Sequence, residues 1–180
     1  MASIFGHGVV AYTFSKILDR HNSKWLLVAA IISSILPDID VMTFHLGVPY
    51  EAPFGHRGFT HSILFAILWA FLLMVTFGKK HNGLWFVVIL LSTLSHGILD
   101  AMTTGGRGVG FLIPFNNDRV FFPLRKIMVS PIEIKSFFSD WGLQVIFSEI
   151  KYILLPCILI LTFLKINEHS KRTKNSRQLD

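Results

Sequence analysis

Histidine and aspartate recur in four short segments that border long apolar stretches of the chain. The segments read GHGVVAY, LPDID, HRGFTHS and SHGILDAMT, in that order along the sequence. Imidazole nitrogens and carboxylate oxygens bind zinc and other divalent metal ions. An ion held in this way lowers the pKa of water from about 15.7 to about 7, which supplies a nucleophile at neutral pH. The candidate metal ligands are His7, Asp38, Asp40, His56, His61, His96 and Asp100.

The segment SHGILD places His96 and Asp100 four residues apart. On a helix this spacing puts both side chains on one face, where they can bind the same ion or two adjacent ions. An isolated pair of this kind more often caps a helix end or points to solvent. Its position inside an apolar run favours the metal-binding interpretation.

The segment LPDID supplies two acids that could bridge two ions. Pro37 disfavours the helical conformation at Leu36, and an extended backbone over residues 38–40 would place both carboxylates on one side. Asp38 or Asp40 is then also the expected catalytic proton acceptor. The alternative is a turn that ends a helix and leaves both acids solvated.

The segment HRGFTHS stands just before an uninterrupted apolar run. We expect His56 in a loop and His61 in the first helical turn, with Thr60 as the N-cap. Arg57 is a candidate catalytic and substrate-binding residue because a guanidinium can hold phosphate oxygens, although it could equally extend toward lipid headgroups.

A glycine-rich loop at residues 103–110 contains Arg107, a second candidate substrate-binding residue. The loop lacks the preceding strand and the terminal Lys-Ser/Thr of a nucleotide-binding P-loop. Its backbone could cradle an anion beside Arg107, although a plain turn is the simpler interpretation.

Composition indicates that lipid is the solvent of this chain. Of 180 residues, 52% are hydrophobic and 16% are charged, and the mean hydropathy is +0.54. These values exclude disorder, and 17 phenylalanines with 4 tryptophans exceed what a soluble core of this size can bury. The single cysteine excludes an intramolecular disulfide and a cysteine-rich zinc module. The net charge of +6 is dispersed over loops, so direct nucleic-acid binding is not expected.

The apolar runs predict an all-α, multi-helix integral membrane bundle. We expect a single domain over residues 1–165, followed by a polybasic tail at 166–180. In the long segment 103–142, FLIPF and VFFPL flank a polar turn and predict a short β-hairpin-like excursion. The apolar runs cover residues 4–18, 25–36, 62–77, 84–102 and 143–164.

The order of the loops along the chain predicts that all candidate ligands meet at one membrane face, because successive loops lie on alternate sides. If each run crosses, the four segments fall on one side, whereas His21, His81 and His169 fall on the other. The side with His21, His81 and His169 carries ten basic residues, and the side with the four segments carries six. The positive-inside rule therefore places the first side and the tail in the cytoplasm, and the metal face on the extracytoplasmic side. Three unpaired carboxylates in a membrane would cost on the order of 8 to 10 kcal/mol, and a tight zinc site returns roughly 10 to 16 kcal/mol.

These motifs resemble the family of bacterial membrane-bound metal-dependent hydrolases, some members of which are described as LexA-binding inner-membrane proteins. The resemblance covers about residues 1–123, and HRGFTHS with the downstream SH-x-x-x-D is its specific part. It implies a multi-pass protein of the bacterial inner membrane that hydrolyses an ester with a bound metal ion.

A more distant similarity is to the zinc-dependent phospholipase C and single-strand nuclease superfamily, which is all-helical and cleaves phosphoesters. This similarity implies metal-binding roles for His7, Asp38, His56 or His61, His96 and Asp100. That superfamily begins with a metal-binding tryptophan, whereas this chain begins Met-Ala-Ser, and its later histidines have no match here. One or two ions, with zinc as the expected metal, are therefore favoured over a cluster of three.

The combined expectation is a membrane-bound hydrolase that cleaves a phosphoester, such as a phospholipid or a lipid-linked phosphate. Its expected partners are membrane lipid and that substrate. The alternative is a non-enzymatic membrane protein that uses the same residues. It would be either a regulator that holds a cytoplasmic protein through the basic tail, or an ion-handling protein.

Overall fold

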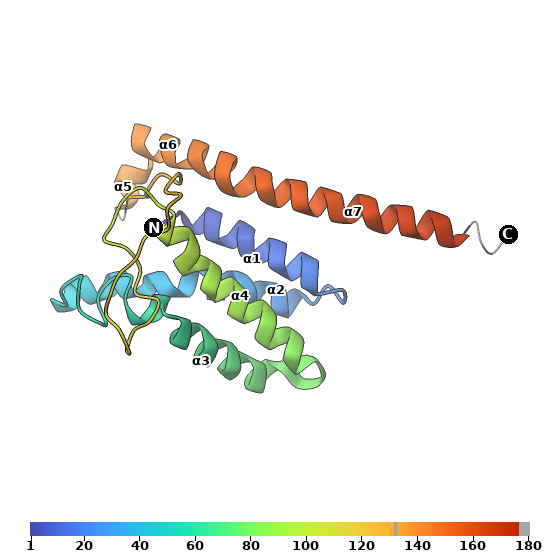
Figure 1. Ribbon diagram of the computed structural model, residues 1–180, viewed down its shortest axis with the longest axis horizontal. Coiled ribbons are helices and arrows are strands. Elements are labelled where there is room, and N and C mark those ends of the chain that lie inside the picture. The colour runs from blue at the N-terminus through green and yellow to red at the C-terminus, as the bar shows by residue number, and fades with distance from the viewer. Residues whose placement is uncertain (132, 177–180) are drawn as a thin grey trace.

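The computed structural model describes residues 1–131 and 133–176, which fold into a helical bundle and one long additional helix (Figure 1). The chain reverses direction between each pair of consecutive helices from α1 to α4, and α7 runs alongside α1 and then projects beyond the bundle. This confirms the all-α expectation. The α-helices are α1 (Ile4–Leu18), α2 (Lys24–Ile35), α3 (Ile63–Leu73), α4 (Asn82–Ala101), α5 (Ile134–Phe137), α6 (Asp140–Glu149) and α7 (Leu155–Ser176).

Shorter helical segments join or extend these helices. The segments η1 (Leu36–Leu46), η2 (Phe59–His61) and η4 (Lys79–His81) are 3-10 helices. The segments η3 (Met74–Gly78) and η5 (Ile150–Leu154) are π-helical, and η5 joins α6 to α7. The first residues of the expected tail therefore belong to α7, and residues 177–180 lie outside the described part.

Three helical stretches are long and apolar enough to cross a membrane. They are Lys24–Leu46, Ile63–Ala101 and Asp140–His169. The second stretch is a helical hairpin in which α3 and α4 pack against each other (Figure 1). Helix α1 has 15 residues and so extends for about 22 Å, short of the roughly 30 Å hydrocarbon core.

The distribution of side chains matches a lipid environment. Large apolar side chains such as Phe5, Trp25 and Phe71 are exposed on the outside of the bundle. Charged and polar side chains such as His96 and Asp100 are fully buried inside it. Polar groups in a membrane protein face the interior because lipid offers them no hydrogen-bond partners.

Small residues bring the first four helices close together. Ala11, Ala30 and Ala70 are fully buried in one core cluster with Val88 and Ile89. Small side chains allow close backbone approach, which is how helices associate when lipid removes the hydrophobic difference between inside and outside. The bundle therefore presents a rigid frame to the loops at its ends.

The expected β-hairpin does not form in the long loop after α4. Within the described residues, the pairing across this turn consists of two isolated bridges, an antiparallel one between Val109 and Val120 and a parallel one between Thr103 and Ile127. Residues 111–115 instead form turns, in which the amide of Phe115 donates to the carbonyl of Leu112. Pro114 contributes no amide hydrogen, so this segment could not pair as a regular strand.

A buried carboxylate connects the end of α6 to the start of α1. Glu149 accepts hydrogen bonds from the backbone amide and the hydroxyl of Ser3, with the hydroxyl at 2.5 Å. Ser3 is also the N-cap of α1 and accepts from the amide of Gly6. Glu149 therefore contacts another helix rather than extending toward the lipid headgroups.

Replacing Glu149 with leucine is expected to lower the thermal stability of the protein in detergent. The change leaves the donors of Ser3 buried without an acceptor, which costs about 1 to 3 kcal/mol. Circular dichroism during heating measures the effect. Glu168→Leu, an exposed position on the same helical stretch, is the matched control and should leave the melting temperature nearly unchanged. Equal melting of both variants would show that the Ser3 contact does not stabilise the fold.

Candidate metal centre

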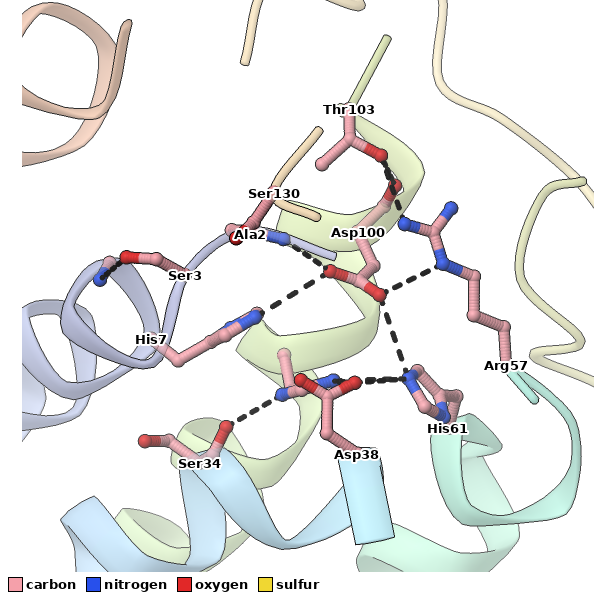
Figure 2. Close-up of polar contacts among 12 residues, drawn as sticks. Ala2, Ser3, His7, Ser34, Asp38, Arg57, His61, Asp100, Thr103 and Ser130 are labelled. Carbon is pink, nitrogen blue, oxygen red and sulfur yellow. Dashed lines mark hydrogen bonds and ion pairs between the residues drawn. The ribbon is translucent and has the colours of Figure 1, made fainter. Parts of the chain in front are cut away.

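All the predicted metal ligands lie at one end of the helix bundle. They come from α1, η1, the following loop, η2 and α4. Figure 2 shows four of them, His7, Asp38, His61 and Asp100, pointing toward one another. His21 and His81 instead contact each other in the turns at the opposite end, with ring centroids 4.7 Å apart. The helices alternate in direction, so segments far apart in sequence arrive at the same end. The predicted ligands are His7, Asp38, Asp40, His56, His61, His96 and Asp100.

Four of these side chains form a compact inner set. Asp38, His61, His96 and Asp100 each offer a ligand atom, and these atoms all lie within 4.8 Å of one another. The Nε2 atom of His96 lies 3.2 Å from an oxygen of Asp38, and Nε2 of His61 lies 3.6 Å from an oxygen of Asp100. Two imidazoles and two carboxylates are a ligand set that zinc accepts.

Hydrogen bonds determine which nitrogens of the inner histidines are available. Nδ1 of His96 lies 2.7 Å from the carbonyl of Ser34, and Nδ1 of His61 lies 3.1 Å from a carboxylate oxygen of Asp40. Carbonyl and carboxylate oxygens only accept, so each Nδ1 carries the hydrogen and each Nε2 presents its lone pair. The two Nε2 atoms face each other at 3.0 Å. Two lone pairs repel at that distance, and either a proton or a metal ion between the two nitrogens removes this repulsion.

Charges around His61 favour a cation at the same place. Burial alone would lower the pKa of this imidazole, but hydrogen bonds with Asp100, Asp38 and Asp40 raise the pKa well above its usual range. The field that favours a proton on His61 equally favours a metal ion.

Several buried polar atoms lack a hydrogen-bond partner among the described residues. They include an oxygen of Asp38, an oxygen of Asp100 and both ring nitrogens of His7. Such atoms are costly to bury without a binding partner, and a cation could bind several of them together. The residues present therefore fit a metal ion.

Asp100 joins the inner ligands to the surrounding groups. One oxygen accepts from the backbone amide of Ala2 at 2.9 Å and lies 3.5 Å from Nε2 of His7. The other oxygen lies 3.0 Å from Nε of Arg57 (Figure 2). His7 also stacks on His96, with ring centroids 3.9 Å apart.

The backbone of LPDID differs from the extended form that the sequence suggested. Leu36 remains helical, and residues 36–46 form the 3-10 helix η1 with Pro37 in its first turn. Proline is tolerated there because its missing amide hydrogen would be unpaired anyway. A 3-10 helix has about three residues per turn, so Asp38 and Asp40 point in different directions.

Asp40 contacts the residues that surround the inner set. Its two oxygens accept from Nδ1 of His56 at 2.6 Å, from the amide of Arg57 at 2.9 Å and from the hydroxyl of Thr60 at 2.7 Å. Asp38, Asp40 and His56 form a second group whose ligand atoms lie within 4.8 Å of one another. Asp40 thus orients His56 and His61 from behind, as carboxylates commonly do for metal-binding histidines.

The N-cap expected at Thr60 is wrong. Phe59–His61 forms η2, and α3 begins at Ile63, with Ser62 as its N-cap accepting from the amide of Phe65. The hydroxyl of Thr60 instead donates a hydrogen bond to the carboxylate of Asp40. The hydroxyl of Thr60 makes a tertiary contact that local sequence rules could not include.

Replacing Asp40 with asparagine is expected to weaken zinc binding about 10- to 100-fold, because outer carboxylates orient the ligands and raise their basicity. Competition with a chromophoric chelator measures the dissociation constant. Asp118→Asn, an exposed loop change, is the control and should bind zinc like the wild type. An unchanged constant in Asp40→Asn would remove Asp40 from the centre.

Arg57 lies inside the site rather than at the membrane surface. Only 1% of the residue is exposed, and its guanidinium contacts Asp100, the carbonyl of Gly105 and the hydroxyl of Thr103. A Cβ atom at Gly106 would stand 2.5 Å from Nη1 of Arg57, so only glycine lets the loop approach this closely. Some of the N–H groups of the Arg57 guanidinium therefore already donate to protein atoms.

Arg107 does not reach the inner ligands. Its side chain is 67% exposed and pairs with Glu51, and its guanidinium lies over the ring of Tyr50, 5.6 Å from the centroid. The glycine-rich loop therefore carries Arg107 on the outer surface of the site, and its anion-binding role stays a prediction.

A cavity of about 430 Å³ opens beside the candidate centre. His56, Arg57, Tyr50 and Gly106 line one part of it. The remaining lining includes Ser130 and Glu133 from the segment before α6 and Trp141 of α6. The volume lies in the range of small-molecule sites.

Comparison with known proteins identifies the family. The sequence profile described as YdjM inner membrane protein matches residues 1–172. The chain belongs to the YdjM family of inner membrane proteins. It is 42% identical to inner membrane protein YbcI of Escherichia coli (strain K12) over 147 residues, which cover 77% of this chain and 82% of YbcI. It is 39% identical to inner membrane protein YdjM of the same strain over 96 residues, which cover 46% of this chain and 47% of YdjM.

The YdjM-family match agrees with the multi-pass inner-membrane expectation. YdjM of Shigella flexneri is likewise 39% identical over 96 residues, covering 46% of this chain and 47% of that protein. No solved structure matches the chain. The membrane-family part of the resemblance is therefore established, and its hydrolase part belongs to the proposal below.

Sequence reasoning missed several partners of the candidate ligands in this YdjM-family chain. The carbonyl of Ser34, the hydroxyl of Thr103 and the amide of Ala2 all contact site residues. Thr103 is the last residue of the SHGILDAMT motif and lies just after the end of α4. This position is a weak signal for a supporting role. The Ser34 and Ala2 contacts are made by backbone atoms, so side-chain identity carried no signal for them.

Proposed function

We propose that this protein is a membrane-bound metal-dependent hydrolase that cleaves a phosphoester. The observation that carries the proposal is the pair of Nε2 lone pairs of His61 and His96, which face each other at 3.0 Å between two buried carboxylates. Such an arrangement is costly without a cation and favourable with one.

The residues that would hold the ion are Asp38, His61, His96 and Asp100, with His7 beside Asp100. Asp38, Asp40 and His56 would form the second position if two ions bind. Zinc is the expected metal because the ligands combine imidazole and carboxylate. When bound, the ion supplies Lewis acidity and an activated water nucleophile.

His56 and Asp40 are arranged to move a proton at the edge of the cavity. Nδ1 of His56 donates to Asp40, which leaves Nε2 as the basic nitrogen of a ring that lines the cavity.

Arg57 would stabilise the negative charge that develops on phosphoryl oxygens. Its guanidinium lines the cavity and is held in place by Asp100, Thr103 and Gly105, so it needs no reorientation during the reaction. Arg107 lies farther out and would attract the anionic substrate toward the cavity.

The membrane location supports a phospholipid or a lipid-linked phosphate as the substrate. The cavity beside the site is lined in part by Trp141 of α6, within a stretch apolar enough to cross the membrane. A substrate with an apolar chain could therefore remain in lipid while its phosphate reaches Arg57. The charge distribution over the loops supports an extracytoplasmic metal face and a cytoplasmic C-terminal end.

The shape of α7 favours one alternative function. This helix projects beyond the bundle (Figure 1) and carries basic residues at Lys165, Lys171, Arg172 and Lys174. A non-enzymatic regulator could hold an acidic cytoplasmic protein with this helix. Such a role would not need metal at the opposite end of the bundle.

The decisive experiment measures metal content and hydrolysis together. The protein is purified in mild detergent, its zinc is counted, and hydrolysis of bis(4-nitrophenyl) phosphate and of phosphatidylglycerol is assayed before and after chelation. We expect one or two ions per chain, loss of hydrolysis on chelation, and recovery when zinc is restored. Bound zinc without hydrolysis on a broad phosphoester panel would favour the non-enzymatic alternative, and no bound metal would overturn the proposal.

A further inference from the structure

A second hollow lies at the end of the bundle opposite the candidate metal centre. It has a volume of about 880 Å³ and is bounded by α2, α3 and the turn that precedes α4. Helix α4 packs against both α2 and α3, and Trp85 of α4 contributes to the lining. We call this hollow the α2–α3 groove.

The wall of the α2–α3 groove is apolar. One face of α2 supplies Trp25, Val28, Ala29 and Ile32, which follow helical spacing along a single stripe. Across the groove, the indole N–H of Trp69 donates to the hydroxyl of Ser33 at 2.9 Å. The indole of Trp69 and the hydroxyl of Ser33 thereby satisfy each other, and the mainly apolar wall suits a hydrocarbon chain.

The charge at one end of the groove is positive. Lys79, Lys80 and His81 lie on the turn between α3 and α4 and line the groove. Among the residues that the structure describes, no aspartate or glutamate lines it. Both lysines are exposed. An anionic headgroup would therefore meet cations at this end without an opposing carboxylate.

The length of the groove matches one leaflet. Its lining on α2 runs from Ser23 to Ser33, and ten residues of helix rise about 15 Å. Half of a hydrocarbon core of roughly 30 Å is the same length. Tryptophan at the charged end, here Trp25, is typical of the membrane interface.

We propose that the α2–α3 groove binds an anionic phospholipid, with an acyl chain along the apolar wall and the phosphate at Lys79 and Lys80. This site is independent of the proposed hydrolase activity, because it lies at the other end of the bundle. The basic turn selects the headgroup, and the apolar wall distinguishes the bound lipid from lipid that only surrounds the protein.

Fluorescence quenching by brominated lipid tests this proposal. The chain has 4 tryptophans, so the triple variant Trp25→Phe, Trp85→Phe, Trp141→Phe retains only Trp69 in the groove. It is reconstituted in phosphatidylcholine vesicles that contain an equal small fraction of either brominated phosphatidylglycerol or brominated phosphatidylcholine. Two lysines near a membrane surface favour an anionic lipid by about 30-fold in relative binding constant, so phosphatidylglycerol should quench Trp69 far more strongly.

Adding Lys79→Gln and Lys80→Gln should reduce that preference by about 10-fold or more. Lys126→Gln with Lys135→Gln makes the same change of charge outside the groove and should leave the preference intact. Equal quenching by the two lipids, or equal preference in both double variants, would overturn the proposal. If the triple tryptophan variant does not fold, native mass spectrometry of the wild type with added phosphatidylglycerol, compared for the same two lysine pairs, decides the question.

Discussion

Replacing His96 with alanine is expected to abolish zinc binding under ordinary purification conditions. The inner set has four ligands, and a tight zinc site contributes roughly 10 to 16 kcal/mol in total, so one ligand accounts for about 3 kcal/mol or more. Affinity should therefore fall at least about 100-fold. Hydrolysis, if the proposed function holds, should fall with it. Zinc counted per chain after dialysis against a weak chelator measures the change.

His81→Ala is the matched control for this experiment. His81 is exposed in the α3–α4 turn at the opposite end of the bundle, so its removal should leave the zinc content at the wild-type value. Circular dichroism checks that both variants keep their helical content. Full zinc retention in folded His96→Ala would contradict the assigned ligand set, whatever the activity.

Replacing Arg57 with methionine is expected to be the most destabilising change at the site. The guanidinium and the carboxylate of Asp100 are both buried, and their atoms lie 3.0 Å apart. Removing one partner of a buried ion pair leaves an uncompensated charge and costs about 3 to 5 kcal/mol. Methionine keeps the apolar part of the side chain, so the loss reports the charge rather than packing. The melting temperature in detergent measures it.

Arg107→Met serves as the control for charge. Its side chain is two-thirds exposed, and surface changes of this kind stay within about 0.5 kcal/mol. Arg57→Lys separates charge from geometry, because lysine restores the charge without the planar fork that reaches Asp100, Thr103 and Gly105 together. If Arg57→Met melts like the wild type, the ion pair with Asp100 does not hold the site together.

The sequence was sufficient to predict the helical class and the end of the bundle at which the ligands meet. Both follow from patterns within single segments, since apolar runs form helices and successive helices alternate in direction. Hence His7, His61 and His96 could be placed together without coordinates. Their common location follows from the alternating direction of successive helices alone.

The division of roles between Asp38 and Asp40 required the tertiary structure. Both acids stand in one short motif, and sequence rules treated them as equivalent. The 3-10 geometry of η1 turns Asp38 toward His96 and Asp40 toward His56 and Thr60. An alternate-residue rule that holds for an extended chain fails when the backbone coils.

The surroundings of Arg57 and Glu149 also depended on long-range packing. Arg57 meets the carbonyl of Gly105, 48 residues away, and Glu149 meets Ser3, 146 residues away. Neither contact has a local signature, because a charged residue beside an apolar run looks the same whether it reaches a headgroup or a buried partner. Local propensities act over a few residues, and they therefore determined the helices of this protein. The distances between groups on different helices depend on how whole helices pack, which only the tertiary structure decided.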